Sequence, residues 1–125
     1  MANRYLNQFQ TSQRKGLVLE AGTISLSAAA AVSTSDFTSL VSSVTKSATG
    51  EYTITLVDKW VGLVSVQCSI ETAEASIQPR IKSADPVTAK TIVIETQDVA
   101  TGTVQDVTAV AKLHINILLK NSSVR

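Results

Sequence analysis

Apolar and polar residues alternate along much of this chain, with the period of two that places every second side chain on one face of a β-strand. The longest alternation lies near the C-terminus, between residues 109 and 120. Its apolar positions are Ala109, Ala111, Leu113, Ile115, Ile117 and Leu119, whereas the other face carries Lys112, His114, Asn116 and Lys120. The pattern predicts a long strand that buries one face and exposes the other.

Two apolar residues, Val110 and Leu118, interrupt the polar face of this strand. Either a second sheet of the same chain or another subunit would have to cover them. Because a β-sheet usually buries its apolar side chains against a second layer of the same domain, we favour the second sheet of the same chain.

A β-hairpin is predicted between residues 44 and 56. Its three-residue turn ends in Gly50, which suits a hairpin with one residue in the left-handed region of backbone conformation. After the turn, Tyr52, Ile54 and Leu56 share one face of the strand, and we expect that face to be buried.

Shorter strands are predicted on either side of this hairpin, at residues 17–19, 23–27, 63–70 and 91–96. In the third of them, four side chains are expected to face inward: Val64, Val66, Cys68 and Ile70. Trp60 lies at the corner between the hairpin and this strand, and we expect its side chain to pack into the core.

Two segments carry signals against a strand. Both prolines, Pro79 and Pro86, fall within residues 79–90, which predicts a long loop. Asp36 follows Ser35 in the pattern of a helix N-cap, and apolar residues come after it at helical spacing. The many Ser and Thr residues there weaken a helix, so we predict at most a short one around residues 36–41.

These elements amount to about seven or eight strands without an internal repeat, which favours an all-β fold: an antiparallel β-sandwich or a jelly-roll-like barrel. The composition agrees, because the chain has 15 Ser, 15 Thr and 15 Val, and both Thr and Val suit a pleated, half-buried surface. Its 125 residues give room for one domain. We expect a single β-sandwich domain over residues 17–125, preceded by an extended N-terminal arm over residues 1–16.

The N-terminal arm is basic and amphipathic. It has no acidic residue, and it holds two of the chain's five aromatic residues. Two interpretations stay open: a frayed terminus, as most termini are, or a segment that docks on a partner protein. In the second, the contacts would come from three basic and three apolar residues: Arg4, Tyr5, Leu6, Phe9, Arg14 and Lys15.

Charge and cysteine content exclude several classes of function. Lys and Arg number 11 and Asp and Glu number 10, so the chain lacks the basic excess of a nucleic-acid-binding protein. The single cysteine, Cys68, cannot form an intramolecular disulfide and is expected to be a buried, unreactive side chain. Residues 1–15 lack the apolar core of a signal peptide, and no stretch is long and apolar enough to cross a membrane. We therefore expect a protein that is made and used without secretion.

Groups for catalysis or metal binding are few. His114 is the one histidine, which excludes a multi-histidine metal site, and its place on the polar face of the last strand favours a solvated or surface-paired role. A hydroxyl–His–carboxylate triad stays open, although no nucleophile elbow is present. The paired carboxylates, Glu71 with Glu74 and Asp98 with Asp106, are expected to be solvated. We expect no enzyme activity, no cofactor and no metal.

Three stretches resemble the small structural proteins of tailed bacteriophages: VTKSATGEYTITL (residues 44–56), DKWVGL running into VSVQ (residues 58–67), and LHINILLKNSSV (residues 113–124). In that group, a hairpin of the SVTKSGTGEYTVTL type precedes a corner of the form Y/W-x-x-L. The chain then closes on a strand with a polar NSS end. Within the group, this chain is most similar to the head decoration, or cement, proteins.

Decoration proteins are small β-sandwich or jelly-roll proteins that bind the outside of an assembled capsid and bridge neighbouring major capsid protein subunits. They act in many copies, often as dimers or trimers, and commonly use extended termini. The resemblance therefore implies a virion protein of the phage head surface, made in the host cytoplasm. Its partners would be the major capsid protein and neighbouring copies of itself, with no direct contact to nucleic acid or membrane. No contact residue is carried over from the group.

Two alternatives stay open. One is a tail, neck or fibre component with a similar sandwich. The other is a ligand-binding β-sandwich, such as a carbohydrate-binding module, which would need exposed aromatic side chains to stack on sugar rings. The domain offers only Phe37, Tyr52 and Trp60 for that purpose, and we expect the last two to belong to the core.

Overall fold

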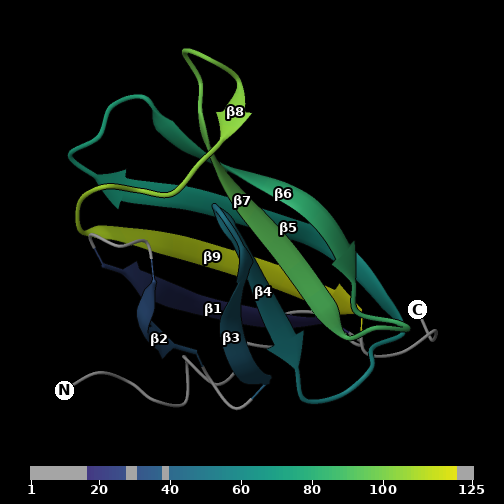
Figure 1. Cartoon of the computed structure of the whole chain (residues 1–125). Coiled ribbons are helices and arrows are strands. Elements are labelled where there is room, and N and C mark those ends of the chain that lie inside the picture. The colour runs from purple at the N-terminus through teal and green to yellow at the C-terminus, as the bar shows by residue number, and fades with distance from the viewer. Residues whose placement is uncertain (1–16, 28–30, 38–39, 121–125) are drawn as a thin grey trace, which may run out of the picture.

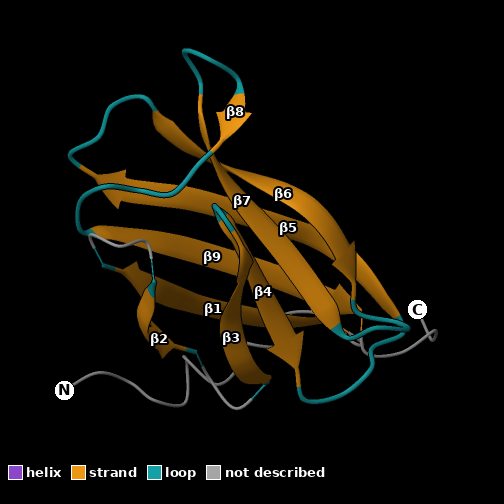
Figure 2. Cartoon of the chain, in the orientation of Figure 1, coloured by secondary structure: helices purple, strands orange, loops and turns teal. Residues whose placement is uncertain are grey.

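The computed structural model describes residues 17–27, 31–37 and 40–120, and this part of the chain is built from β-strands (Figure 1, Figure 2). No helix occurs within these ranges. The strands are β1 (Leu17–Leu26), β2 (Val32–Asp36), β3 (Val41–Ala48), β4 (Glu51–Leu56), β5 (Gly62–Thr72), β6 (Ile77–Asp85), β7 (Thr91–Asp98), β8 (Thr103–Val104) and β9 (Ala111–Lys120). The predicted all-β class is confirmed.

The strands form two antiparallel sheets. Sheet A has the strand order β2-β1-β9-β5, and sheet B has the order β3-β4-β7-β6, with the short β8 paired to β7. Figure 1 shows the two sheets as layers that lie against each other. In the part of the chain that is described, no ladder joins the edge strands of one sheet to those of the other, so the architecture is a β-sandwich.

The core lies between the inner faces of the two sheets. The buried side chains come from alternate positions of β1, β4, β7 and β9, as the period-two pattern predicts. The largest of them are Ile24 and Leu26 in β1, Tyr52, Ile54 and Leu56 in β4, Ile92 and Ile94 in β7, and Leu113, Ile115, Ile117 and Leu119 in β9. The predicted inner faces of the hairpin and of the last strand are therefore confirmed.

The tip of the β3–β4 hairpin is held by the segment that precedes β9. Gly50 has a φ of 66°, the left-handed conformation that the turn predicts. Its N–H donates to Oδ1 of Asp106 over 2.5 Å, and its carbonyl accepts from the N–H of Thr96 over 2.8 Å. A second bond, 2.8 Å long, joins Lys46 Nζ to Asp106 Oδ2. The hairpin is thus fixed in place by residues far from it in the sequence.

The predicted loop over residues 79–90 is wrong. Residues up to Asp85 belong to β6, and a short turn follows from Pro86. Pro79 is tolerated in β6 because this strand lies at the edge of sheet B and pairs with β7 alone, so the missing N–H interrupts no second ladder.

The short helix predicted around residues 36–41 is also wrong. Asp36 ends β2 and Val41 begins β3, and residues 38–39 between them lie outside the described ranges. The apolar residues that suggested a helix lie instead where the chain crosses from sheet A to sheet B, and there Phe37, Val41 and Val44 pack against the core. Pairing of the Ser- and Thr-rich β3 with β4 decides the structure here, since those residues favour strands over helices.

Two details of the predicted strands need correction. β1 runs without a break through Gly22, so the two predicted strands at residues 17–19 and 23–27 are one. In β5 the register shifts between Leu63 and Ser65, which makes Val64 a bulge. Val64 is 51% exposed instead of facing inward. The three residues predicted to follow it inward, Val66, Cys68 and Ile70, do pack against the core.

Candidate functional site

The outer face of sheet B is polar, and its charges are paired with one another. Lys82 Nζ lies 2.5 Å from Oε2 of Glu51, and the Arg80 guanidinium binds the carboxylate of Glu95, which is only 5% exposed. The hydrogen bond from Lys82 holds the pKa of Glu51 below its ordinary value. These four charged side chains are therefore already paired within the described structure.

The outer face of sheet A carries an apolar patch across three neighbouring strands. Leu19 in β1 pairs with Leu118 in β9, and on the other side Leu118 pairs with Ser65 in β5, beside the bulged Val64. Leu19 is 37% exposed and Val64 is 51% exposed. We call Leu19, Val64 and Leu118 the Leu118 patch.

The expectation that a second sheet of the same chain covers Leu118 is wrong. Sheet B packs on the opposite face of β9, against Ile117 and Leu119, and Leu118 is not part of the core. Val110, the other apolar residue in question, precedes β9 and is 70% exposed. In the described structure, the Leu118 patch therefore faces away from the core.

The Leu118 patch lies at the end of sheet A where the chain enters the domain. Leu17 begins β1 and pairs with Lys120, two residues along the ladder from the pair of Leu19 with Leu118 and on the same face. Leu17, where the predicted N-terminal arm would join the domain, thus lies beside the patch. A partner that covers the patch would consequently lie within reach of the arm.

A polar row crosses the same face farther along the strands, with His114 at its centre. Nδ1 of His114 lies 3.1 Å from Oγ1 of Thr23, and Nε2 lies 3.0 Å from Oε1 of Glu71. Asp36 continues the row, because it pairs with Thr23 in the β1–β2 ladder. We call these four residues the His114 row. The hydrogen bond to His114 lowers the pKa of Glu71, and the surface-paired role predicted for His114 is confirmed.

Hydroxyl, imidazole and carboxylate follow one another in the His114 row in the order that hydrolases use for nucleophile, base and orienting acid. Such chemistry also needs donors for a developing oxyanion. β9 is paired along its length with β1 on one side and β5 on the other, so its backbone N–H groups are used in the two ladders, and the Glu71 side chain is 66% exposed. The row therefore presents a hydrogen-bonded imidazole on the outer face of sheet A.

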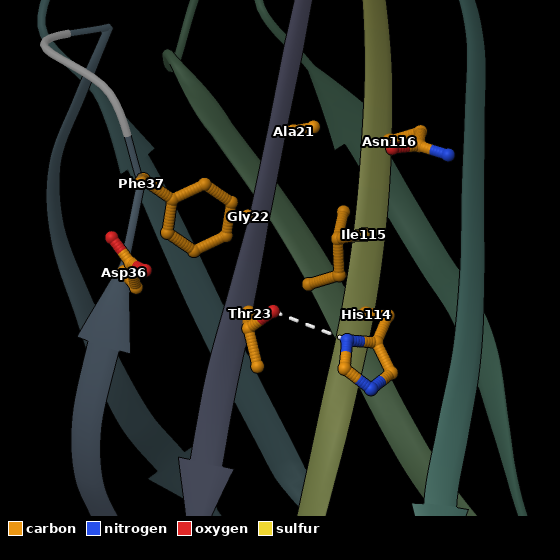
Figure 3. Close-up of a pocket in the computed structure, with 8 residues that line it drawn as sticks. All are labelled: Ala21, Gly22, Thr23, Asp36, Phe37, His114, Ile115 and Asn116. Atoms are coloured by element: carbon orange, nitrogen blue, oxygen red, sulfur yellow. Dashed lines mark hydrogen bonds between the residues drawn. The ribbon is translucent and has the colours of Figure 1, made fainter. Parts of the chain in front are cut away.

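A shallow pocket of about 420 Å³ adjoins both features (Figure 3). It is lined by Ala21, Gly22, Thr23, Asp36, Phe37, His114, Ile115 and Asn116. The Phe37 ring lies directly against Gly22, and a Cβ at that position would overlap the ring. Because glycine leaves this space free, the sequence fixes an aromatic side chain in the wall of the pocket.

Asp36 differs from most carboxylates of the chain because it has no hydrogen bond or ion pair within the described ranges. Asn116, which lines the same pocket, likewise has no side-chain partner there. Seven other acids accept hydrogen bonds: Glu51, Glu71, Glu74, Asp85, Glu95, Asp98 and Asp106. Glu71, expected to be solvated, is exposed, and Glu74, Asp98 and Asp106 are half-buried at the surface while also accepting hydrogen bonds.

The Cys68 thiol adds no reactive group to the outer face of sheet A. Burial raises the pKa of the Cys68 thiol to about 12, so the thiol is protonated at neutral pH and unreactive. The described residues contain no group of three or more side chains that could hold a metal ion.

Among the same residues, no helix is long and apolar enough to cross a membrane.

The six residues predicted to contact a partner, Arg4, Tyr5, Leu6, Phe9, Arg14 and Lys15, all lie outside the described ranges. The outer face of sheet A was not predicted as a site. The alternation in β9 does place His114, Asn116 and Leu118 on one face, so the sequence indicates the part of the site that β9 contributes. The rest of the site comes from β1, β2 and β5, and no local pattern gives their register with β9.

Comparison of the chain with protein-family models, with curated proteins and with solved structures gives no match.

Proposed function

We propose that this protein is a structural component of a phage virion, a capsid decoration protein that binds the outer surface of the assembled head. The observation that carries the proposal is the Leu118 patch, in which the exposed Leu19 and Val64 flank the half-buried Leu118, at the place where the predicted basic, amphipathic arm would join the domain. Exposed apolar side chains grouped on neighbouring strands are typical of a surface that binds another protein. The resemblance of residues 44–67 and 113–124 to decoration proteins supports the same conclusion.

The proposed mechanism is mechanical. Packaged DNA presses on the shell from inside, and the shell fails where subunits separate. A protein that binds two neighbouring major capsid protein subunits stabilises the closed shell by its own binding free energy, repeated over many copies. The Leu118 patch would hold one subunit, and the arm would reach the next through Tyr5, Leu6 and Phe9. A fully extended segment of 16 residues spans at most about 55 Å.

The alternatives fit the described surface less well. A tail, neck or fibre component could use the same patch, and only its location in the virion separates it from a head protein. A carbohydrate-binding module would need exposed aromatic rings, yet Tyr52 is buried and Trp60 packs against the core. Phe37 is half-buried in the wall of the pocket on sheet A.

Binding to heads tests the proposal. Purified protein is mixed with expanded, genome-filled heads of the phage that encodes it, and the bound fraction is measured by co-sedimentation. We expect saturable binding that weakens about tenfold when Leu118→Ser removes the centre of the patch. Val110→Ser is the matched control, because Val110 is also exposed and apolar but lies before β9, and it should bind like the wild type.

The arm is tested in the same assay by removing residues 1–14. The truncated protein should keep the cooperative unfolding of the sandwich and lose affinity for heads. Unchanged affinity of both the truncated protein and Leu118→Ser would contradict the proposed contacts. Absence of binding by the wild type would contradict the proposed function.

A further inference from the structure

We propose that the pocket beside the Leu118 patch receives an arginine side chain of the major capsid protein. The inference rests on the proposed function, because it concerns the protein that covers the patch. It starts from Asp36, whose carboxylate lines the pocket without a partner among the residues that the structure describes. Lys and Arg side chains are absent from the lining, so a cation from outside would be the first to pair with this charge.

The other side chains of the pocket suit a planar guanidinium group. Asp36 lies at one side of the pocket and can accept two parallel hydrogen bonds from it. The Phe37 ring offers a face on which a guanidinium stacks. Ala21 and Gly22 leave an apolar path for the methylene stem.

The pocket and the Leu118 patch belong to one continuous surface. Leu19 with Leu118 and Ala21 with Asn116 are alternate pairs of the β1–β9 ladder, and Thr23 with His114 is the next pair on this face. Any protein that covers the patch therefore covers the mouth of the pocket and excludes water from Asp36. A carboxylate that is desolvated in this way without a cation would weaken binding, whereas a matching arginine makes the contact specific.

The His114 row holds the rim of the pocket in place. Thr23 and Glu71 hold the imidazole from both sides, so its two nitrogen atoms are already occupied before a partner arrives. The imidazole is thus held in place in advance, which lowers the entropy cost of ordering it on binding.

The test compares Asp36→Asn with Asp58→Asn in the head-binding assay. Asp58 is the matched control: an exposed carboxylate, likewise without a partner in the described part of the chain, but outside the pocket. Asp36→Asn should weaken head binding about tenfold or more, and Asp36→Lys further still, while Asp58→Asn binds like the wild type. Thermal unfolding of each variant verifies that the fold is retained.

Wild-type affinity of Asp36→Asn for heads would overturn the inference and leave the proposed function standing. A change in the oligomeric state of the free protein on Asp36→Asn, measured by sedimentation velocity, would also overturn it, because the occupant would then be a second copy of this chain.

If the wild type fails to bind heads, the proposed function fails, and NMR titration of the free protein with N-acetyl-arginine amide decides the nature of the pocket. Shifts at residues 21–23, 36–37 and 114–116 that vanish in Asp36→Asn would support a guanidinium pocket. No shifts, or shifts with N-acetylglucosamine instead, would overturn it. Trp60 is not a suitable reporter of this event, because it does not line the pocket.

Discussion

At the scale of single residues, Gly50 shows how one position can fix a long-range contact. Its φ of 66° lies in the region that favours glycine, and a Cβ would also lie 2.7 Å from the carbonyl oxygen of Gln105. Gly102 has a φ of 71° as well, but nothing lies within 4 Å of the place where its Cβ would be. An alanine at position 102 would therefore meet backbone strain alone, whereas an alanine at position 50 would meet both backbone strain and steric overlap.

We expect Gly50→Ala to lower the free energy of unfolding by about 3 kcal/mol and Gly102→Ala by about 1 kcal/mol. Both variants bear the strain of a left-handed alanine, and only Gly50→Ala must also move the backbone at Gln105. Urea denaturation of the two variants measures the difference. Equal losses would mean that the hairpin tip adapts without cost.

The pair of Arg80 and Glu95 gives a second prediction at this scale. Glu95 is 5% exposed, whereas the Arg80 side chain is 57% exposed, so removing the arginine leaves a mostly buried carboxylate without its cation. We expect Arg80→Ala to cost about 1–2 kcal/mol, discounted for solvent screening at the arginine. Adding Glu95→Gln should recover part of the loss. Denaturation of the single and double variants checks this, and losses that simply add would contradict it.

At the scale of elements, local patterns predict well which residues form strands, and poorly which strands pair with each other. The β3–β4 hairpin and β9 follow from alternation and from one glycine turn, because these signals lie within a few residues of one another. β6 was missed because its status as an edge strand, which makes Pro79 harmless, depends on the order of strands in sheet B. The bulge at Val64 has the same origin, since it is a mismatch of two paired strands.

The site could be predicted only in part for the same reason. Thr23 and His114 are 91 residues apart, and Glu71 is 43 residues from His114. Their contacts depend on the register of β1 and β5 against β9, which the alternation of any one strand leaves open. The position of Leu118 outside the core could not be read from β9 either, since the alternation gives the buried face but does not tell whether a second layer also covers the other face.

The two faces of β9 give a prediction that belongs to the element. Ile115 is buried between the sheets and Asn116, its neighbour, lies on the outer face without a side-chain partner among the described residues. Ile115→Ala should lower the free energy of unfolding by about 3 kcal/mol, because it opens a cavity in the core, whereas Asn116→Ala should stay within about 0.5 kcal/mol of the wild type. Thermal or urea unfolding compares them. Similar losses would contradict the assignment of the two faces.

At the scale of the whole molecule, hydrogen bonds to carboxylates make stability depend on pH at the acid end. Hydrogen bonds lower the folded-state pKa of several acids, among them Glu51, Glu71, Glu74 and Asp85. A lowered pKa contributes stability that is present above the unfolded-state pKa and is lost as the pH falls through the folded-state pKa. Stability should therefore decline below about pH 4.

The alkaline end follows from groups whose pKa is raised. Burial raises the pKa of Tyr52 to about 12, and the hydrogen bond to Glu51 raises that of Lys82. Their contribution is complete below the unfolded-state pKa and is lost as the pH rises, so stability should also decline above about pH 10. Melting temperatures measured across the pH range check both limits. A stability that does not change from about pH 5 down to pH 3 would contradict the acid limit.

The outer faces of sheet A and sheet B differ in how their charged and apolar side chains are paired. The outer face of sheet B pairs its own charges, whereas the outer face of sheet A combines the exposed Leu118 patch with a pocket whose carboxylate has no partner among the described residues. We therefore propose that the domain binds its partner through sheet A, with Leu17, where the predicted arm would join the domain, at the same end. The proposal gives the orientation of the domain on the head as well as its location.

Electron cryo-microscopy of expanded heads saturated with the protein tests that claim most directly. We predict density on the outer surface at the seams between capsid subunits, with the sandwich placed so that sheet A faces the shell and sheet B faces solvent. Density confined to the tail or neck, or a sandwich bound through sheet B, would contradict it.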